Sequence, residues 1–403
     1  MKPEYDVIVI GGGAAGMISS VKAAERKRRV LLLEQSSRTG RKILASGNGR
    51  CNLMNTGEFR YYGDTAFADR VFQYCTRKDL ISFLNDYGLI LTEETEGRVY
   101  PVTYQSASVH SVLNNAMEIN GVHTVMNSRV QSAGCHDGYF RIQTSEGKEY
   151  SSGKLIVACG GAAQPKLGGS YDGYGLMQAF GHRMIQARPS LVPLLADRIS
   201  ISGLAGIRIR CGVSLVRNRE IIHQEDGEVL FTEYGISGIC IMQCARFAEI
   251  PGSCVYMDFL KYAFPDVHSA REELLRRKRV FHTCSPLWLL NGILPEKLSF
   301  AVLKQAGLKM HGESVSEIDE HMIGHIVDTA KAYCVRITGS RGFEHAQVTA
   351  GGTDCSEIEA STMESRMVQG LHAAGEVLNA DGDCGGFNMM FAFATGLIAG
   401  NAV

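Results

Sequence analysis

The sequence has little of what several protein classes require. Its 403 residues contain no apolar run near the roughly 18 residues that a membrane-spanning helix needs. The 41 basic and 42 acidic residues leave a net charge of −1, so the basic field used for nucleic-acid binding is absent. None of the twelve cysteines forms a C-x-x-C pair, and none has the close Cys/His spacing of a zinc site. A membrane span, a metal site and a nucleic-acid partner are therefore not expected.

The N-terminus, MKPEYDVIVIGGG, does not resemble a secretory signal, because Glu4 and Asp6 precede only a short apolar run. Without such a signal we expect a cytoplasmic protein with reduced cysteines. Cys240 and Cys244 are four residues apart and could share a helix face, where buried reduced thiols are the preferred interpretation.

Glycine is abundant, with 45 residues that gather beside apolar runs. The first cluster, GGGAAG at Gly11–Gly16, fits G-x-G-x-x-G between a predicted strand (Tyr5–Ile10) and a predicted helix (about Ala14–Arg26). In this pattern the three glycines permit a tight turn, a close approach of the backbone to a pyrophosphate, and helix packing on the strand. The anion would lie at the helix N-terminus.

Glu34 strengthens this interpretation. It ends the next predicted strand, Val30–Glu34, 18 residues after Gly16. An acid at this place accepts hydrogen bonds from ribose hydroxyls. The glycine motif and Glu34 together predict a dinucleotide-binding site. An acidic residue here, rather than an arginine, argues against a nucleotide that carries a 2′-phosphate.

A second glycine signature lies at the other end of the chain. Gly375-Glu376 follows the apolar strand Leu371–Ala374, and Gly385-Gly386-Phe387-Asn388 opens an apolar helix, Asn388–Ala399. Such a helix N-terminus can stabilise negative charge on a reduced flavin. Two helix N-termini, one from each end of the chain, favour FAD over NAD.

The segment from Gly40 to Gly57 is predicted to be a loop, rich in small and polar residues. Its glycines would let the backbone lie against a flat ring, and Arg41, Lys42 and Arg50 could neutralise phosphate or reduced flavin. A basic surface loop is the alternative.

Cys51 has no cysteine partner at the spacing of flavin disulfide reductases, so dithiol chemistry is disfavoured. No second G-x-G-x-x-G lies in a strand–helix context, so a separate NAD(P)H-binding domain is not evident.

The pattern of predicted secondary structure changes at Pro189. Residues 190–260 look like short strands, and residues 266–330 show charge and helical periodicity, including Val315–Thr329. We predict an α/β protein of three domains. Residues 1–189 plus 346–403 form the FAD-binding domain, 190–265 plus 331–345 an inserted β-rich domain, and 266–330 a small helical domain.

The chain resembles the FAD-binding flavoproteins often labelled the aminoacetone oxidase family, or bile-acid-pathway (3-dehydro-bile acid reductase-like) NAD(P)/FAD-dependent oxidoreductases. Four segments carry the resemblance: GGGAAG, GRKILASGNGRCN at 40–52, TEYGISG at 232–238, and residues 348–396. It implies a Rossmann-like fold of the two-dinucleotide-binding type, with an inserted β-rich domain and a small helical domain.

The resemblance also implies a set of cofactor-binding residues. Together with the motifs above, the set is Gly11, Gly12, Gly13, Ala14, Ala15, Gly16, Glu34, Gln35, Arg41, Lys42, Ser46, Gly47, Asn48, Gly49, Arg50, Cys51, Asn52, Val130, Gly160, Gly161, Gly375, Glu376, Gly385, Gly386, Phe387, Asn388, Met389 and Met390. Val130 would contact adenine through its backbone. Three places depart from the family pattern, near the flavin or substrate face: Asn379 replaces an Asp, Met389-Met390 replace Leu-Gln, and TEYGISG lacks a His and a following Pro.

The implied function is a flavin-dependent oxidoreductase acting on CH–CH groups, an ene-reductase that reduces a steroid- or bile-acid-like enone with NAD(P)H. No pattern selects the catalytic acid among Tyr171, Tyr174, His182 and Arg50. Three alternatives stay open: an amine oxidase using oxygen, an RNA-associated flavoprotein supported only by the basic run 276–279, and a flavin-binding protein without turnover. The sequence does not indicate an oligomeric state.

Overall fold

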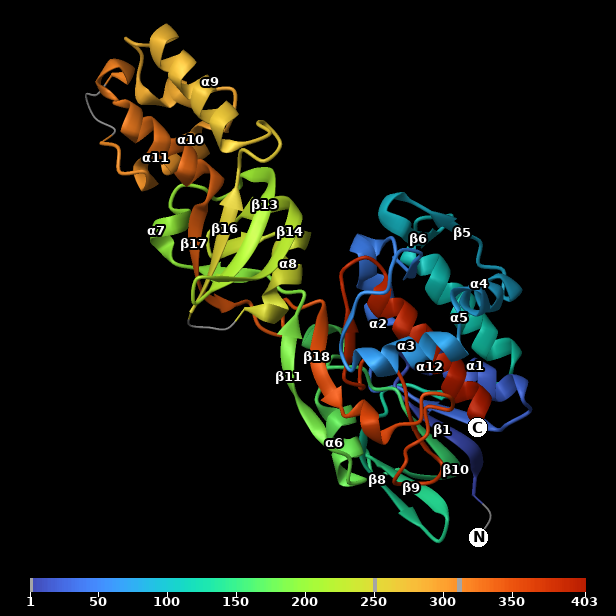
Figure 1. The fold of residues 1–403 in the computed structure, drawn as a ribbon. Coiled ribbons are helices and arrows are strands. Elements are labelled where there is room, and N and C mark those ends of the chain that lie inside the picture. Colours follow the sequence, from blue (N-terminus) through green and yellow to red (C-terminus); the bar gives the residue numbers. More distant parts are fainter. Residues whose placement is uncertain (1–2, 249–251, 310–313) are drawn as a thin grey trace. The chain divides into compact units, whose positions relative to one another are not determined.

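The computed structural model describes residues 3–248, 252–309 and 314–403, and within them the chain forms two compact units. The first comprises Met1–Pro189 and Gln347–Val403, and the second comprises Ser190–Ala346. Both ends of the chain therefore build the first unit (Figure 1). The finer division of the second unit into a β-rich and a helical domain stays a prediction.

A seven-stranded sheet forms the centre of the first unit, in the order β7-β2-β1-β10-β9-β8, with β19 also paired to β10. Strands β7, β2, β1, β10 and β19 are parallel, whereas β9 runs antiparallel to both β10 and β8. The central strands read as continuous apolar runs because both of their faces are buried. The bounds are β1 Tyr5–Ile10, β2 Val30–Leu33, β7 His123–Val125, β8 Val130–His136, β9 Tyr139–Thr144, β10 Glu149–Val157 and β19 Leu371–Ala373.

Helices and three small sheets complete this unit. The helices are α1 Ala14–Glu25, α2 Arg41–Ala45, α3 Thr65–Tyr74, α4 Arg77–Asp86, α5 Ser106–Ile119, α6 Asp172–Ala179 and α12 Phe387–Ala402. The small sheets pair β3 (Met54–Asn55), β6 (Arg98–Pro101) and β5 (Leu91–Glu93); β20 (Ala380–Gly382) and β4 (Tyr61–Gly63); and β11 (Met184–Ser190) and β18 (Val348–Thr353).

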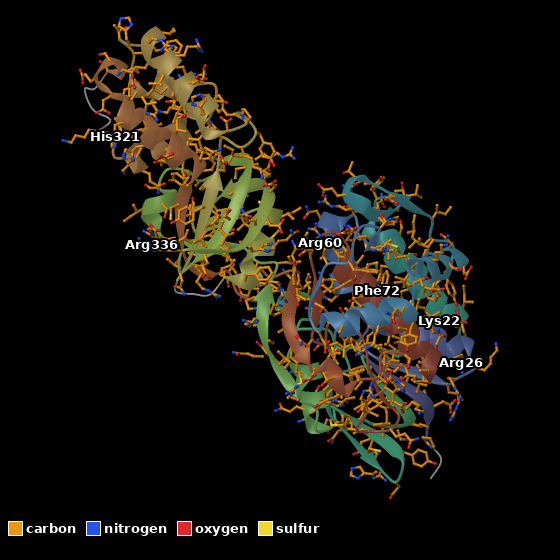
Figure 2. The ribbon with its side chains drawn as sticks, viewed as in Figure 1. Lys22, Arg26, Arg60, Phe72, His321 and Arg336 are labelled. Atoms are coloured by element: carbon orange, nitrogen blue, oxygen red, sulfur yellow. The ribbon has the colours of Figure 1, made fainter. Side chains whose placement is uncertain are left out.

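Helices α1 and α12 pack closely along their length, which joins the two ends of the chain (Figure 1). A Cβ on Gly396 would lie 2.6 Å from the Ala15 carbonyl oxygen, and one on Gly400 would lie 2.6 Å from the Ser19 carbonyl oxygen and the same distance from the Cβ of Lys22 (labelled in Figure 2). Glycine at both positions therefore lets the two backbones touch. Because each contact moves four residues forward on both helices, α1 and α12 run in the same direction.

The second unit contains a closed barrel of six strands, in the order β12-β15-β14-β13-β16-β17. Its strands are β12 Leu194–Ala196, β13 Arg208–Arg217, β14 Glu220–Phe231, β15 Gly235–Ser237, β16 Ser253–Asp258 and β17 Tyr333–Ser340. Its helices are α7 Arg198–Ile201, α8 Ile239–Cys244, α9 Val267–Val280, α10 Glu296–Gln305 and α11 Glu320–Lys331.

The prediction of a helix over Val315–Thr329 is wrong at its start. Val315–Glu317 form a separate 3₁₀ turn, and α11 begins at Glu320. The carboxylate of Asp319 caps this helix by accepting a hydrogen bond from the Met322 N–H, which fixes the later start.

In the described part of the chain, no helix is both long and apolar enough to cross a membrane, and no group of three or more possible metal ligands gathers. All twelve cysteines are free thiols, and Cys240 and Cys244 are both buried on α8.

The contact between α1 and α12 makes a testable prediction. Gly396→Ala should lower the free energy of unfolding by about 1–3 kcal/mol, because its Cβ meets backbone that cannot move aside. Gly324→Ala on α11 is the matched control, since a Cβ there meets nothing within 4 Å. Alanine at this helical site should be neutral or stabilise by up to about 1 kcal/mol. Urea unfolding of both variants checks this, and equal stabilities would contradict it.

Candidate functional site

Four of the predicted cofactor segments follow the carboxyl ends of four neighbouring parallel strands. Gly11–Gly16 follow β1, Glu34 follows β2, Gly160-Gly161 follow β10, and Gly375-Glu376 follow β19. Carboxyl ends of parallel strands meet at one edge of a sheet, where open α/β sheets bind their ligands. The fold thus gathers segments from both ends of the chain at one edge.

The glycines of the segment Gly11–Gly16 are needed for different structural reasons. Gly11 has a φ of +104°, and a Cβ on Gly16 would lie 1.8 Å from the Gly11 carbonyl oxygen, so both positions require glycine for internal packing. A Cβ on Gly13 would meet nothing within 4 Å, and Gly13 caps α1 without a side-chain hydrogen bond. The backbone at this helix N-terminus is therefore uncovered, as required for binding an anion.

The carboxylate of Glu34 is buried and held by the backbone on both sides. Its Oε2 accepts a hydrogen bond from the Gly12 N–H at 2.7 Å, and its Oε1 accepts one from the Ser36 N–H at 2.7 Å. A carboxylate has about four lone-pair sites, so two remain for ribose hydroxyls. Glu34 therefore fixes the first turn and keeps acceptor capacity for a ligand.

The loop prediction for residues 40–57 is wrong in its first part, where Arg41–Ala45 form α2. The following residues take left-handed backbone conformations, with φ of +56° at Gly47, +54° at Asn48, +83° at Gly49 and +58° at Cys51. Such conformations cost free energy at non-glycine residues and concentrate at ligand sites. A Cβ on Gly49 would meet nothing within 4 Å, so the backbone is uncovered here too.

Two of the predicted cofactor-binding cations are held by the protein itself. Arg41 donates to Ser36 Oγ and to the Lys166 carbonyl, at 3.3 and 2.5 Å. The guanidinium of Arg50 pairs with Glu94 at 2.6 Å and lies over the rings of Tyr100 and Tyr104, with its central carbon 4.4 and 4.6 Å from the ring centroids.

The third cation, Lys42, belongs to a polar cluster with Glu376. Lys42 Nζ lies 3.1 Å from Glu376 Oε2, and the Thr349 N–H donates to Glu376 Oε1 at 2.8 Å. Thr349 Oγ1 accepts a hydrogen bond from the Ala163 N–H. A Cβ on Gly161 would lie 2.5 Å from both Glu376 Oε1 and Thr349 Oγ1, so this position admits only glycine.

The N-terminus of α12 packs against the end of the 46–52 segment. Gly386 has a φ of +104°, and its Cβ would lie 2.4 Å from the Met54 carbonyl oxygen and 2.6 Å from Asn52 Oδ1. The Asn388 side chain is already used, since it donates to the Gly382 carbonyl at 2.7 Å and accepts from the Gly382 N–H at 2.8 Å. Only the backbone of Asn388 is therefore available to a ligand.

Some polar atoms at this edge are buried without a partner among the described residues. Asn52 Oδ1 lies beside Gly386, and Ser128 Oγ lies in the segment whose Ser128 N–H donates to the Glu34 carbonyl. Burying such an atom unpaired costs about 1–3 kcal/mol. Together with the uncovered backbone at Gly13 and Gly49, these atoms fit an extended ligand with polar groups at both ends, as FAD has.

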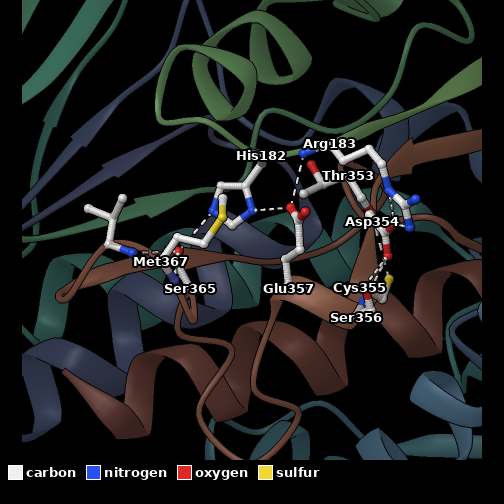
Figure 3. A network of polar contacts seen from close by, with 10 residues as sticks. His182, Arg183, Thr353, Asp354, Cys355, Ser356, Glu357, Ser365 and Met367 are labelled. Carbon is white, nitrogen blue, oxygen red and sulfur yellow. Dashed lines mark hydrogen bonds and ion pairs between the residues drawn. The ribbon is translucent and has the colours of Figure 1, made fainter.

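Two candidate acids from the sequence are placed differently by the structure. His182 is buried in a network in which Nδ1 lies 3.0 Å from Glu357 Oε2 and Nε2 lies 2.9 Å from Ser365 Oγ (Figure 3). Arg183 joins this network by pairing with Asp354, so His182 serves to hold the chain together. Tyr174 lies on α6 rather than in a loop.

Burial raises the pKa of the Cys51 thiol to about 11, which makes it a poor nucleophile at neutral pH.

The remaining predicted residues lie at the same edge or beside it. Gln35 donates to the Gly168 carbonyl at 2.9 Å, and Val130 is buried at the start of β8. Thr349 and Ser128 are site residues that the sequence reasoning missed, because neither lies in a glycine motif.

Comparison with known proteins places this geometry in a family. The model of the HI0933-like protein Rossmann domain matches residues 5–402. The chain belongs to the HI0933-like family. It is 32% identical over 385 residues to the 3-dehydro-bile acid delta(4,6)-reductase of Clostridium scindens, covering 93% of this chain and 92% of that protein. It is 30% identical over 404 residues to the ribosomal RNA dihydrouridine synthase of Escherichia coli, covering 97% and 96%.

Among solved structures, the 3-ketosteroid-delta4-(5alpha)-dehydrogenase of Rhodococcus jostii matches with a TM-score of 0.49 at 17% identity, covering 99% of this chain and 96% of that one. The predicted fold class, a Rossmann-type FAD-binding domain in an α/β protein, is confirmed by the family. The prediction of a flavin-dependent oxidoreductase is confirmed as well.

The hydrogen bonds of Glu34 make a testable prediction. Glu34→Ala should lower the stability of the FAD-free protein by roughly 1–3 kcal/mol, because the buried Gly12 N–H and the partly buried Ser36 N–H lose their acceptor. FAD affinity should fall as well, by about 1–3 kcal/mol for the lost ribose contacts. Glu149→Ala, at an exposed position of the same unit, should change stability by less than about 0.5 kcal/mol. Urea unfolding and FAD titration measure the two effects, and a Glu34→Ala protein as stable as Glu149→Ala would contradict the role of Glu34.

Proposed function

We propose that this protein reduces a C=C bond conjugated to a carbonyl group, with tightly bound, non-covalent FAD and with NAD(P)H as the electron donor. The preferred substrate is a small, largely apolar enone of the steroid or bile-acid type. The observation that carries this proposal is the chemistry shared by the two relatives.

A delta(4,6)-reductase of a 3-dehydro-bile acid acts on double bonds conjugated to a ketone. Formation of dihydrouridine from uridine saturates a ring C=C bond that is also conjugated to a carbonyl. The two named substrates differ greatly, yet each reaction adds two electrons and two protons across an activated C=C bond. The reaction type is therefore better supported than any one substrate.

The site supports binding of FAD along the sheet edge. The uncovered N-terminus of α1 would hold the pyrophosphate, and Glu34 would accept from the adenosine ribose. Bound FAD supplies two-electron redox chemistry. The N-terminus of α12 would favour negative charge on the nearby ring, because no acidic residue lies in its first turn.

We propose that the electron donor NAD(P)H and the substrate bind in turn at the same site. The sequence holds one G-x-G-x-x-G motif in a strand–helix context, so a nicotinamide would bind beside the flavin ring where the substrate binds, deliver its electrons and leave. Cys51 is buried with a high pKa, which disfavours a thiol relay as the alternative route.

The charge of the inserted unit argues against an RNA substrate. Residues 190–346 carry 18 Lys and Arg against 18 Asp and Glu, so this unit has no basic excess for RNA. Within the basic run at 276–279, Arg276 and Arg277 both pair with Glu273, and Arg277 also donates to the Asn291 carbonyl at 2.6 Å. These contacts fit a role of the two arginines within the fold.

A uridine in RNA is the second candidate substrate, since the Escherichia coli relative is named for that reaction. An amine oxidase or a flavoprotein without turnover would be indicated by the same assays that test the main proposal.

The cofactor assignment predicts the result of a release experiment. Heating the purified yellow protein should release intact FAD into the supernatant, because the site binds through backbone N–H groups and Glu34 rather than through a covalent bond. Chromatography of the supernatant identifies the flavin. Release of FMN, or colour that stays with the denatured protein, would contradict the assignment.

The reaction predicts that NADH or NADPH reduces the flavin anaerobically and that an α,β-unsaturated ketone reoxidises it. Rigid steroid-like enones should react better than short ones, because remote apolar binding energy orients the reacting carbon. Double-reciprocal plots should show parallel lines, and product made from deuterated nicotinamide should carry deuterium at the β-carbon.

Parallel assays separate the alternatives. Reoxidation by ribosomal RNA but by no enone would replace the substrate with uridine. Oxygen consumption with an amine, without reaction of any enone, would replace the reductase with an oxidase. A flavin that no donor reduces would indicate a protein without turnover.

A further inference from the structure

Asn55 is a buried side chain that joins three separate stretches of backbone. It ends β3 and is 5% exposed, and β3 is held in place by its pairing with Arg98 and its neighbour on β6. The amide nitrogen donates to the Glu96 carbonyl at 3.1 Å and to the Gly385 carbonyl at 3.0 Å, and Oδ1 accepts from the Gly57 N–H at 2.8 Å. Both amide donors are used, and two carbonyls against one N–H leave a single orientation for the amide.

The contact with Gly385 matters because the peptide that follows this residue would otherwise be free to turn. Gly385 and Gly386 have φ of +124° and +104°, a region that side chains rarely tolerate, and neither has a Cβ to restrict the peptide between them. The hydrogen bond from Asn55 holds the carbonyl of this peptide. Because a trans peptide is planar, its C=O and N–H point in opposite directions, so Asn55 also fixes the direction of the Gly386 N–H.

The Gly386 N–H is available to a ligand. Gly386 is partly exposed and is the N-cap residue of α12. Among the residues that the structure describes, none accepts a hydrogen bond from this N–H. An unpaired N–H at the start of a helix attracts negative charge. A reduced flavin carries more negative charge than an oxidised one, so a ring beside this N–H would be bound more strongly in its reduced form.

We propose that Asn55 is a positioning residue that raises the reduction potential of bound FAD. Asn55 acts through the Gly385–Gly386 peptide, whose N–H stabilises the negative charge of the reduced ring. The inference rests on the proposed binding of FAD and requires no particular substrate. It gives a role to a residue that lies outside the glycine motifs and outside the predicted set of cofactor-binding residues.

The test compares Asn55→Ala with Asn120→Ala in purified holoprotein. Asn120 is the matched control, because its amide nitrogen also donates to a backbone carbonyl, that of Ala116 at 2.8 Å, and to Tyr87 Oη at 2.8 Å. Both substitutions should lower the thermal midpoint of the apoprotein, since carbonyls lose their donors. Only Asn55→Ala should weaken the binding of reduced relative to oxidised FAD, by about three- to tenfold. For a two-electron couple this makes the reduction potential about 15–30 mV more negative, as measured by anaerobic equilibration with a reference dye.

Asn55→Asp is the second variant, because it keeps an acceptor for the Gly57 N–H and loses both donors. Its potential should fall at least as far as that of Asn55→Ala, since the carboxylate also adds negative charge. An unchanged potential in both Asn55 variants, or an equal fall in Asn120→Ala, would overturn this inference and leave the cofactor assignment intact. Loss of FAD from both Asn55 variants would overturn it too, by showing that Asn55 supports the oxidised state equally. A wild-type protein without FAD would overturn both the inference and the cofactor assignment.

Discussion

The backbone contact between α1 and α12 is the constraint on which the site depends. Gly396 and Gly400 let α12 lie directly against Ala15 and Ser19, and the two helices run in the same direction. Gly396 lies nine residues after the start of α12, whereas its contact Ala15 lies one residue after the start of α1. The N-terminus of α12 therefore extends eight residues beyond that of α1, which is about 12 Å along the helix axes. One packing contact therefore fixes the distance between the N-termini of α1 and α12.

Backbone rather than side-chain charge is what this edge offers to an anion. Arg41, Lys42 and Arg50 all lie in the expected segment, but each is held by protein acceptors. A cation already paired with a carboxylate adds little net field for a ligand, whereas unpaired N–H groups at a helix start keep their full donor capacity. The three cations therefore contribute to holding α2 and the 46–52 segment in place, and the N-terminus of α1 is the part of this edge proposed to bind the pyrophosphate.

The sequence was informative where a local pattern has one structural meaning. The run Tyr5–Ile10 and the glycines after it predict a strand and a turn that the structure contains, because each signal acts within its own βαβ unit. The role of Glu34 as ribose acceptor stays a prediction. The short helix Arg41–Ala45 has too few residues to show helical periodicity. Ser128 and Thr349 gain their meaning from contacts with Glu34 and Glu376, which distant segments create. No spacing along the chain encodes such contacts, so these residues become visible only in the folded protein.

The underused polar groups also connect stability with binding. Asn52 Oδ1 and Ser128 Oγ are buried without partners at opposite ends of the proposed ligand path. A fold that only had to be stable would gain by replacing each with an apolar atom, because each unpaired group costs about 1–3 kcal/mol. A ligand that supplies the missing partners recovers this cost in the bound state alone. If bound FAD supplies partners to these two atoms, as proposed, this free energy contributes to its affinity, and the bound protein gains stability in proportion to the logarithm of ligand concentration over Kd.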